Sequence, residues 1–113
     1  MKKYIIIFIA IFFLSGNFNH EQFRIINYWS KIITDNKRIE VVDNISYCGR
    51  PATFESFYGC YHPRSKVIEV WNKCPVFEFV LLHEIGHSTG IIKEHLANNY
   101  AYEHIFSRYG IIK

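Results

Sequence analysis

The chain has 113 residues and a mass of 13.5 kDa, which is enough for one small domain and too little for two. Half of the residues are hydrophobic and 18% are aromatic, so the composition excludes an intrinsically disordered chain. The formal net charge is only +3 and the 13 basic residues are scattered, so the sequence gives no sign of a nucleic-acid-binding surface.

Residues 1–16 have the organisation of a secretory signal peptide. Lys2 and Lys3 precede the uninterrupted apolar run from Tyr4 to Leu14, and Ser15 and Gly16 follow it. As a helix this run would rise about 16 Å, roughly half of the hydrocarbon thickness of a bilayer. We therefore expect a signal peptide or, if residues 4–18 stay attached, an N-terminal membrane anchor. Either alternative predicts that the domain formed by residues 17–113 is exported (secreted or periplasmic) or anchored to the membrane.

Residues 21–35 have the apolar periodicity of one amphipathic helix. Apolar side chains recur at positions i, i+4, i+7 and i+8, which are Ile25, Trp29, Ile32 and Ile33. Asp35 and Asn36 then end the predicted helix.

Between residues 39 and 71 the pattern changes to short strand-like runs. The runs are IEVV, ISYC, FYGCY and VIEVW, and turn residues separate them. This pattern predicts a small antiparallel sheet. Cys48 and Cys60 lie in this region, so we expect these two cysteines to form a disulfide in an oxidising compartment and Cys74 to stay unpaired. Other pairings, or three buried thiols, are the alternatives.

Two helices complete the predicted fold. Pro75 fits the first turn of a helix that runs to Gly90, and a last helix covers residues 98–109. The last helix has one apolar face, formed by Tyr102, Ile105, Phe106 and Tyr109. The order of helix, strands, helix and helix predicts an α+β fold.

The motif with chemical significance is HEIGH, residues 83–87, within the first of these two helices. Positions i and i+4 lie on the same face of a helix, so His83 and His87 can bind one Zn²⁺ ion while Glu84 lies beside it. Zinc lowers the pKa of a bound water toward about 7. Glu84 can then act as the general base that takes a proton from this water during attack on a carbonyl group.

A zinc site of this kind needs a third protein ligand. The candidates downstream are Glu94, His95, Glu103 and His104. The first two follow Gly90 so closely that the chain would have to reverse tightly. Only one of the second two can face the metal because neighbouring helical positions point about 100° apart, and the apolar periodicity favours Glu103.

Three blocks between residues 59 and 110 carry a family resemblance. They are an extended turn and strand, the LLHEIGHSTG helix and a tyrosine-rich helix, at Tyr61–Trp71, Leu81–Gly90 and Tyr100–Arg108. Together they resemble the zincin-like metallopeptidase domain of ArdC-type antirestriction proteins and of phage and plasmid polyvalent proteins. The resemblance covers under half of the chain, and the middle block is the specific one. It implies a minimal zincin-like fold in which an active-site helix is followed by a second helix.

The resemblance also implies roles for individual residues. It places the third ligand at His104, with Ser107 as the small residue three positions later, although Arg108 stands where an acidic residue is expected. On this ground we choose His104 as the third ligand and keep Glu103 as the alternative. The resemblance further places an edge strand for pairing with an extended peptide substrate at Val67, Ile68, Glu69 and Val70, where the alternative is an ordinary core strand.

The sequence therefore predicts a zinc-dependent metallopeptidase that hydrolyses peptide bonds in a peptide or protein substrate through a metal-bound water and Glu84. The alternative is a catalytically weak or inactive, membrane-tethered binding or immunity module in which zinc only stabilises the fold. Substitution of Glu84 by glutamine discriminates between the two hypotheses.

Overall fold

A computed structural model describes residues 19–45, 48 and 58–110. The described elements are helix α2 (His20–Trp29), the short 3₁₀ helix η1 (Ser30–Ile32), strands β1 (Arg38–Val42), β2 (Gly59–His62) and β3 (Val67–Trp71), and helices α4 (Phe77–Ser88) and α5 (Glu94–Tyr109). The fold is α+β, as the sequence predicts. The expected signal or anchor segment lies outside the described residues, and within them no helix has the length and apolar character needed to cross a membrane.

The three described strands form a mixed sheet in the order β1-β3-β2. Strands β2 and β3 are antiparallel, whereas β1 and β3 are parallel. The expectation of an antiparallel sheet is therefore wrong for β1, because alternation of apolar residues along a strand does not encode the direction of its neighbour.

The expectation that Val67, Ile68, Glu69 and Val70 form an edge strand is also wrong. These residues belong to β3, which is paired on both sides and lies at the centre of the sheet. All four residues are buried, as expected for a strand with neighbours on both sides. Backbone pairing of a substrate with β3 is therefore excluded by β1 and β2.

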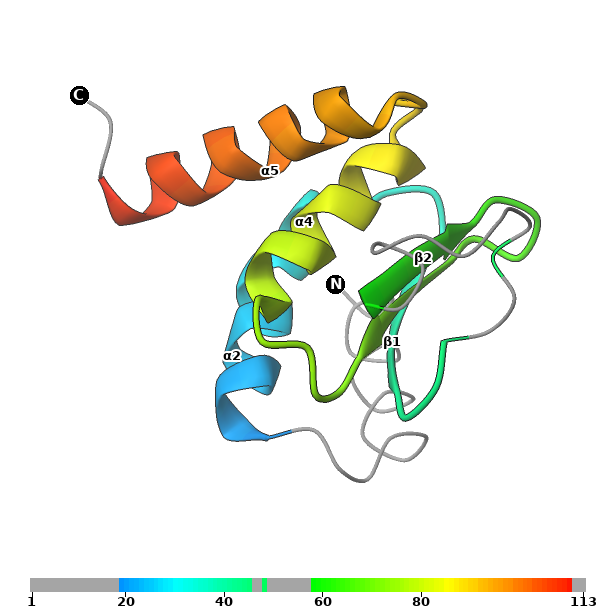
Figure 1. The fold of residues 1–113 in the computed structure, drawn as a ribbon, viewed down its shortest axis with the longest axis horizontal. Helices are drawn as coiled ribbons and strands as arrows, with labels where there is room; N and C mark the ends of the chain where they lie inside the picture. Colours follow the sequence, from blue (N-terminus) through cyan, green and yellow to red (C-terminus); the bar gives the residue numbers. More distant parts are fainter. Residues whose placement is uncertain (1–18, 46–47, 49–57, 111–113) are drawn as a thin grey trace.

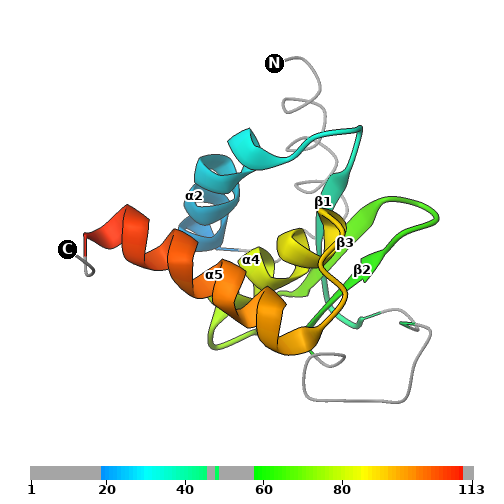
Figure 2. The ribbon, with the colours of Figure 1, turned by 90° about the horizontal axis from the view of Figure 1, so that it is seen from above.

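Helix α4 is the middle layer of the molecule (Figures 1 and 2). It contacts α5 on one side and β2 and β3 on the other, and it also contacts α2. Because neighbours surround it, eight of its twelve residues are buried: Phe77, Val80, Leu81, Leu82, His83, Glu84, Ile85 and Gly86. The polar residues His83 and Glu84 thus lie inside the molecule between α5 and the sheet.

The boundaries of the last two helices decide which side chains reach one another. Helix α4 ends at Ser88, and Gly90 has a φ of 111°, a left-handed conformation that permits a tight reversal. Helix α5 then begins at Glu94, four residues before the expected start at Asn98. The chain therefore does make the tight reversal after Gly90 that weighed against Glu94 as a ligand in the sequence analysis.

Two glycines allow close packing around α4. A Cβ atom on Gly59 of β2 would lie 2.6 Å from Val80 Cγ1 and 3.1 Å from Glu84 Cγ. A Cβ atom on Gly86 would lie 3.1 Å from the ring of Tyr100 on α5. The contact at Gly59 is too short for a larger residue without a shift, and the contact at Gly86 is tight, so these positions let β2 and α5 approach the helix that carries the HEIGH motif.

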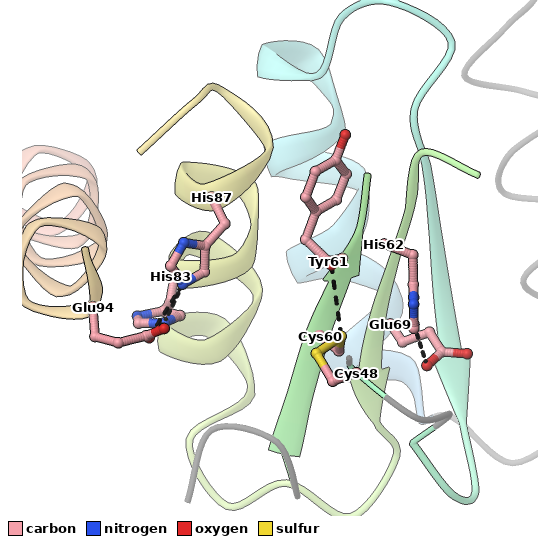
Figure 3. The surroundings of a disulfide bond; sticks show 8 residues. All are labelled: Cys48, Cys60, Tyr61, His62, Glu69, His83, His87 and Glu94. Atoms are coloured by element: carbon pink, nitrogen blue, oxygen red, sulfur yellow. Dashed lines mark hydrogen bonds and ion pairs between the residues drawn. A yellow bond between two sulfur atoms is a disulfide. The ribbon is translucent and has the colours of Figure 1, made fainter. Parts of the chain in front are cut away.

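A disulfide joins Cys48 to Cys60 on β2, with a Cα–Cα distance of 6.0 Å (Figure 3). This confirms the expected pairing. Cys74 is unpaired and buried, and burial raises the pKa of its thiol, against a smaller opposing effect of a hydrogen bond with the Val76 backbone.

Candidate metal centre

The two histidines of the HEIGH motif lie one turn apart on α4 and point to the same place. Their Nε2 atoms are 3.1 Å apart, and the two rings meet at 84°. The i, i+4 spacing predicts this arrangement, because residues four positions apart occupy one face of a helix. His83 is 1% exposed, so the pair lies at the inner wall of the site.

Glu94, the first residue of α5, brings a carboxylate to the two imidazoles (Figure 3). Its Oε1 atom lies 2.9 Å from Nε2 of His83 and 3.2 Å from Nε2 of His87. In a tetrahedral zinc site with bonds of about 2.0–2.1 Å, neighbouring ligand atoms are about 3.3 Å apart. The three atoms thus have nearly the spacing of three ligands of one zinc ion. Among the described residues, these three form the one group of His, Cys, Asp or Glu that could hold a metal.

The outer nitrogen of each imidazole is held by a hydrogen bond. Nδ1 of His87 lies 2.7 Å from the backbone oxygen of Ile91, and Nδ1 of His83 lies 2.7 Å from Oδ1 of Asn98. A carbonyl oxygen only accepts, so Nδ1 of His87 must donate. The same assignment holds for His83, where the amide oxygen of Asn98 accepts. Partners of this kind fix the orientation and tautomer of histidines that bind metals.

Electrostatics favour neutral His83 and ionised Glu94. Burial lowers the pKa of His83, and nearby His87 lowers it further, against the opposing effect of hydrogen bonds that Glu94 and Asn98 accept from its ring. Burial alone would raise the pKa of Glu94, but the attraction of His87 and the hydrogen bonds with both histidines outweigh it and lower that pKa. Metal binding requires these two protonation states, a neutral imidazole and a carboxylate.

Glu84 lies beside the two histidines and is completely buried. Its Cγ atom lies against the backbone of Gly59. Glu84 and His83 together line a pocket of about 240 Å³. A buried carboxylate that lines a pocket beside His83 has the chemistry of a proton acceptor.

The structure does not bring His104 or Glu103 to this group; Glu94 takes the position expected of His104. His104 hydrogen-bonds through Nδ1 to the Tyr100 backbone oxygen at 2.9 Å, and its ring packs against Trp29 and Tyr100. Glu103 is exposed. The physical reason is the helix start: position 104 is ten residues beyond Glu94, which is about 15 Å along the axis of α5.

One sequence signal could have identified Glu94. Gly90 permits a left-handed turn, and Glu94 and Asn98 have the i, i+4 spacing of a helix face directed back at α4. Both residues of this pair contact His83.

Comparison with protein-family models, curated proteins and solved structures gives no match for this chain. Its functional interpretation therefore depends on the geometry of the site.

Proposed function

We propose that the protein is a zinc-dependent metallopeptidase in which His83, His87 and Glu94 hold the metal and Glu84 is the general base. The observation that carries this proposal is the convergence of three electron-pair donors on one point. The two imidazole Nε2 atoms and Glu94 Oε1 lie 2.9–3.2 Å from one another. Two nitrogens and one carboxylate oxygen are a donor set that suits zinc.

The hydrogen-bond pattern strengthens the proposal. Because the Nδ1 atoms of His83 and His87 donate to Asn98 and Ile91, each Nε2 atom either donates a proton to Glu94 or carries a lone pair that a metal can use. These lone pairs and the Glu94 carboxylate would repel one another unless a cation or a proton lay between them. A divalent cation satisfies all three donors at once.

The surroundings of the three ligands suit a catalytic site as well as a structural one. The Glu94 side chain is 43% exposed, so one side of the group is accessible from solvent. A catalytic zinc site has three protein ligands and an open fourth position. A zinc ion bound there would lower the pKa of a water molecule and polarise the carbonyl group of the substrate.

Glu84 supplies the proton transfer in this proposal. Its carboxylate accepts a proton as the water attacks the peptide carbonyl and delivers a proton to the leaving amine as the C–N bond breaks. Its burial against Gly59 of β2 restricts its motion, which suits a group that must transfer a proton from a fixed position. The substrate class is a peptide or protein.

The disulfide supports an exported protein, because disulfides persist in oxidising compartments and are rare in the cytosol. We therefore keep the proposal of a secreted, periplasmic or membrane-anchored enzyme, with residues 4–18 as the anchor in the last case.

The test is substitution of Glu84 by glutamine in the full chain. Glu84→Gln should keep one zinc per chain by metal analysis and lose at least about 100-fold in the rate of hydrolysis of an unfolded protein substrate, because a positioned general base contributes 10²–10⁴-fold. Glu103→Gln is the matched control, since Glu103 is an exposed glutamate on α5. Equal hydrolysis by the native protein and Glu84→Gln would exclude the catalytic role.

A second candidate function is a non-enzymatic binding or immunity module stabilised by zinc. The supporting observation is that His83 and His87 come from α4 and Glu94 comes from α5, so a cation would cross-link two helices. This function predicts that removal of zinc unfolds the domain while neither the native protein nor Glu84→Gln hydrolyses any peptide.

A further inference from the structure

The pocket beside Glu84 and His83 has walls that the proposed reaction does not use. Apart from Asn98, which orients His83, its remaining lining residues are Tyr58, Val76, Phe79, Val80 and Tyr102. Its volume of about 240 Å³ is below the range of about 300–1,000 Å³ that is typical of sites enclosing a whole small ligand. The pocket therefore has the size to receive one side chain.

Two aromatic walls define the shape of this pocket. Tyr58, next to the start of β2, stacks on Trp71 with ring centroids 5.7 Å apart and planes within 4°. Phe79 of α4 packs against Tyr102 of α5, with ring centroids 4.9 Å apart. Each wall is thus supported by a neighbouring ring, which restricts its motion.

The other lining residues favour an apolar guest. Val76 and Val80 contribute aliphatic surface, and the polar lining residues, His83, Glu84 and Asn98, are the ones that belong to the proposed catalytic site. A flat aromatic guest gains more than an aliphatic one between aromatic walls, because offset-stacked and edge-to-face ring pairs are favourable beyond the area that they bury.

We propose that this pocket binds an aromatic side chain of the substrate, on a residue adjacent to the bond that is hydrolysed. The inference rests on the proposed function, since the pocket gains this role from Glu84 and His83 at its wall. It assigns a substrate class, peptides with phenylalanine, tyrosine or tryptophan next to the cleaved bond, and makes Tyr58, Phe79 and Tyr102 residues that determine specificity.

Zinc-binding probes that differ only in their side chain test the inference without requiring turnover. The probes are N-acetylated hydroxamates of phenylalanine, leucine and glycine, and their affinity for the zinc-loaded full chain is measured by calorimetry. The hydroxamate group is the same in all three, so differences report the pocket. We expect the phenylalanine probe to bind at least about tenfold more tightly than the glycine probe and more tightly than the leucine probe.

Two variants at the rim of the pocket locate the effect. Tyr102 is 48% exposed and Val76 is 47% exposed, so Tyr102→Ala and Val76→Lys should fold. Each should reduce the affinity for the phenylalanine probe toward that for the glycine probe and leave the glycine probe unchanged. Leu96→Ala is the matched control, because Leu96 is 45% exposed on α5 and is not a lining residue.

The outcomes separate this inference from the proposed function. Equal binding of the three probes, or tighter binding of the leucine probe, overturns the aromatic pocket and leaves the metal centre intact. Failure of the native chain to bind zinc or any hydroxamate overturns the proposed function and the pocket with it. A phenylalanine preference that survives in both Tyr102→Ala and Val76→Lys also overturns the assignment to this pocket.

Discussion

Glu94 is the residue on which the candidate metal centre depends, because it brings a carboxylate from a second helix to the imidazoles of α4. Asn98, one turn later on the same face of α5, accepts a hydrogen bond from His83 Nδ1 at 2.7 Å. A candidate ligand, Glu94, and the partner that orients His83 thus come from one turn of α5. By contrast, His104 lies further along α5 and packs against Trp29 and Tyr100.

This arrangement predicts that only one of two substitutions weakens zinc binding. Glu94→Ala should weaken zinc binding by more than the 10–100-fold that is typical of losing an outer-shell partner, because it removes a ligand atom. His104→Phe, which preserves a ring between Trp29 and Tyr100, should leave zinc affinity unchanged. Competition with a chromophoric chelator measures both affinities. The reverse result, with zinc lost only in His104→Phe, would exclude Glu94 as the ligand.

At the scale of elements, α4 and α5 are joined at both ends of their contact. The candidate metal centre joins the C-terminal half of α4 to the start of α5. At the other end, Glu78 of α4 accepts hydrogen bonds from Arg108 at 2.6 Å and from Tyr109 at 2.7 Å. Trp29 of α2 donates a third hydrogen bond to Glu78 at 2.6 Å. Arg108, which stands where the family resemblance expects an acid, therefore has a structural partner in this fold.

Substitution of Arg108 tests this contact between helices. Arg108→Met should lower the free energy of unfolding of the metal-free protein by about 1–3 kcal/mol, because it leaves the Glu78 carboxylate, 14% exposed, with less compensation for its burial. Urea unfolding measures the change. In the control Arg24→Met, the broken pair with Glu21 is 62% and 65% exposed, so the change should stay within about 0.5 kcal/mol. Equal effects of the two substitutions would contradict a structural role of Arg108.

At the scale of the whole molecule, the described part of the chain is a three-stranded sheet covered by helices on one face (Figure 2). A core of this size supplies little stability, and small domains commonly add cross-links. The Cys48–Cys60 disulfide is one cross-link. A cation between α4 and α5 would be a second, in a different part of the fold.

Zinc should therefore raise the thermal stability of the protein. A ligand at 100 times its Kd stabilises the native state by about 2.7 kcal/mol, which corresponds to a rise in Tm of about 10–20 °C for a domain of this size. Calorimetry with zinc and with a chelator measures the shift. His83→Ala should show no response to zinc. A native Tm that is unchanged by zinc would contradict the proposed metal centre.

Local patterns in the sequence predict the parts of the fold that depend on neighbouring residues. The spacing of His83 and His87 places both on one face of α4, and the turns and strand-like runs indicate β1, β2 and β3. The pairing of Cys48 with Cys60 was predicted because both cysteines lie in the region of the strand-like runs. The structure confirms it. The direction of β1 relative to β3 and the central position of β3 were not predictable, since period-two alternation is the same for parallel, antiparallel, edge and central strands.

The sequence by itself determined that two imidazoles and a carboxylate, His83, His87 and Glu84, occur together on one buried helix, because helical geometry fixes positions i, i+1 and i+4. Only the tertiary structure decided that Glu94 completes the group. That outcome depends on where α5 begins after the turn at Gly90 and on how closely Gly86 lets Tyr100 approach α4. These are contacts between elements, and the periodicity of a single helix does not contain them.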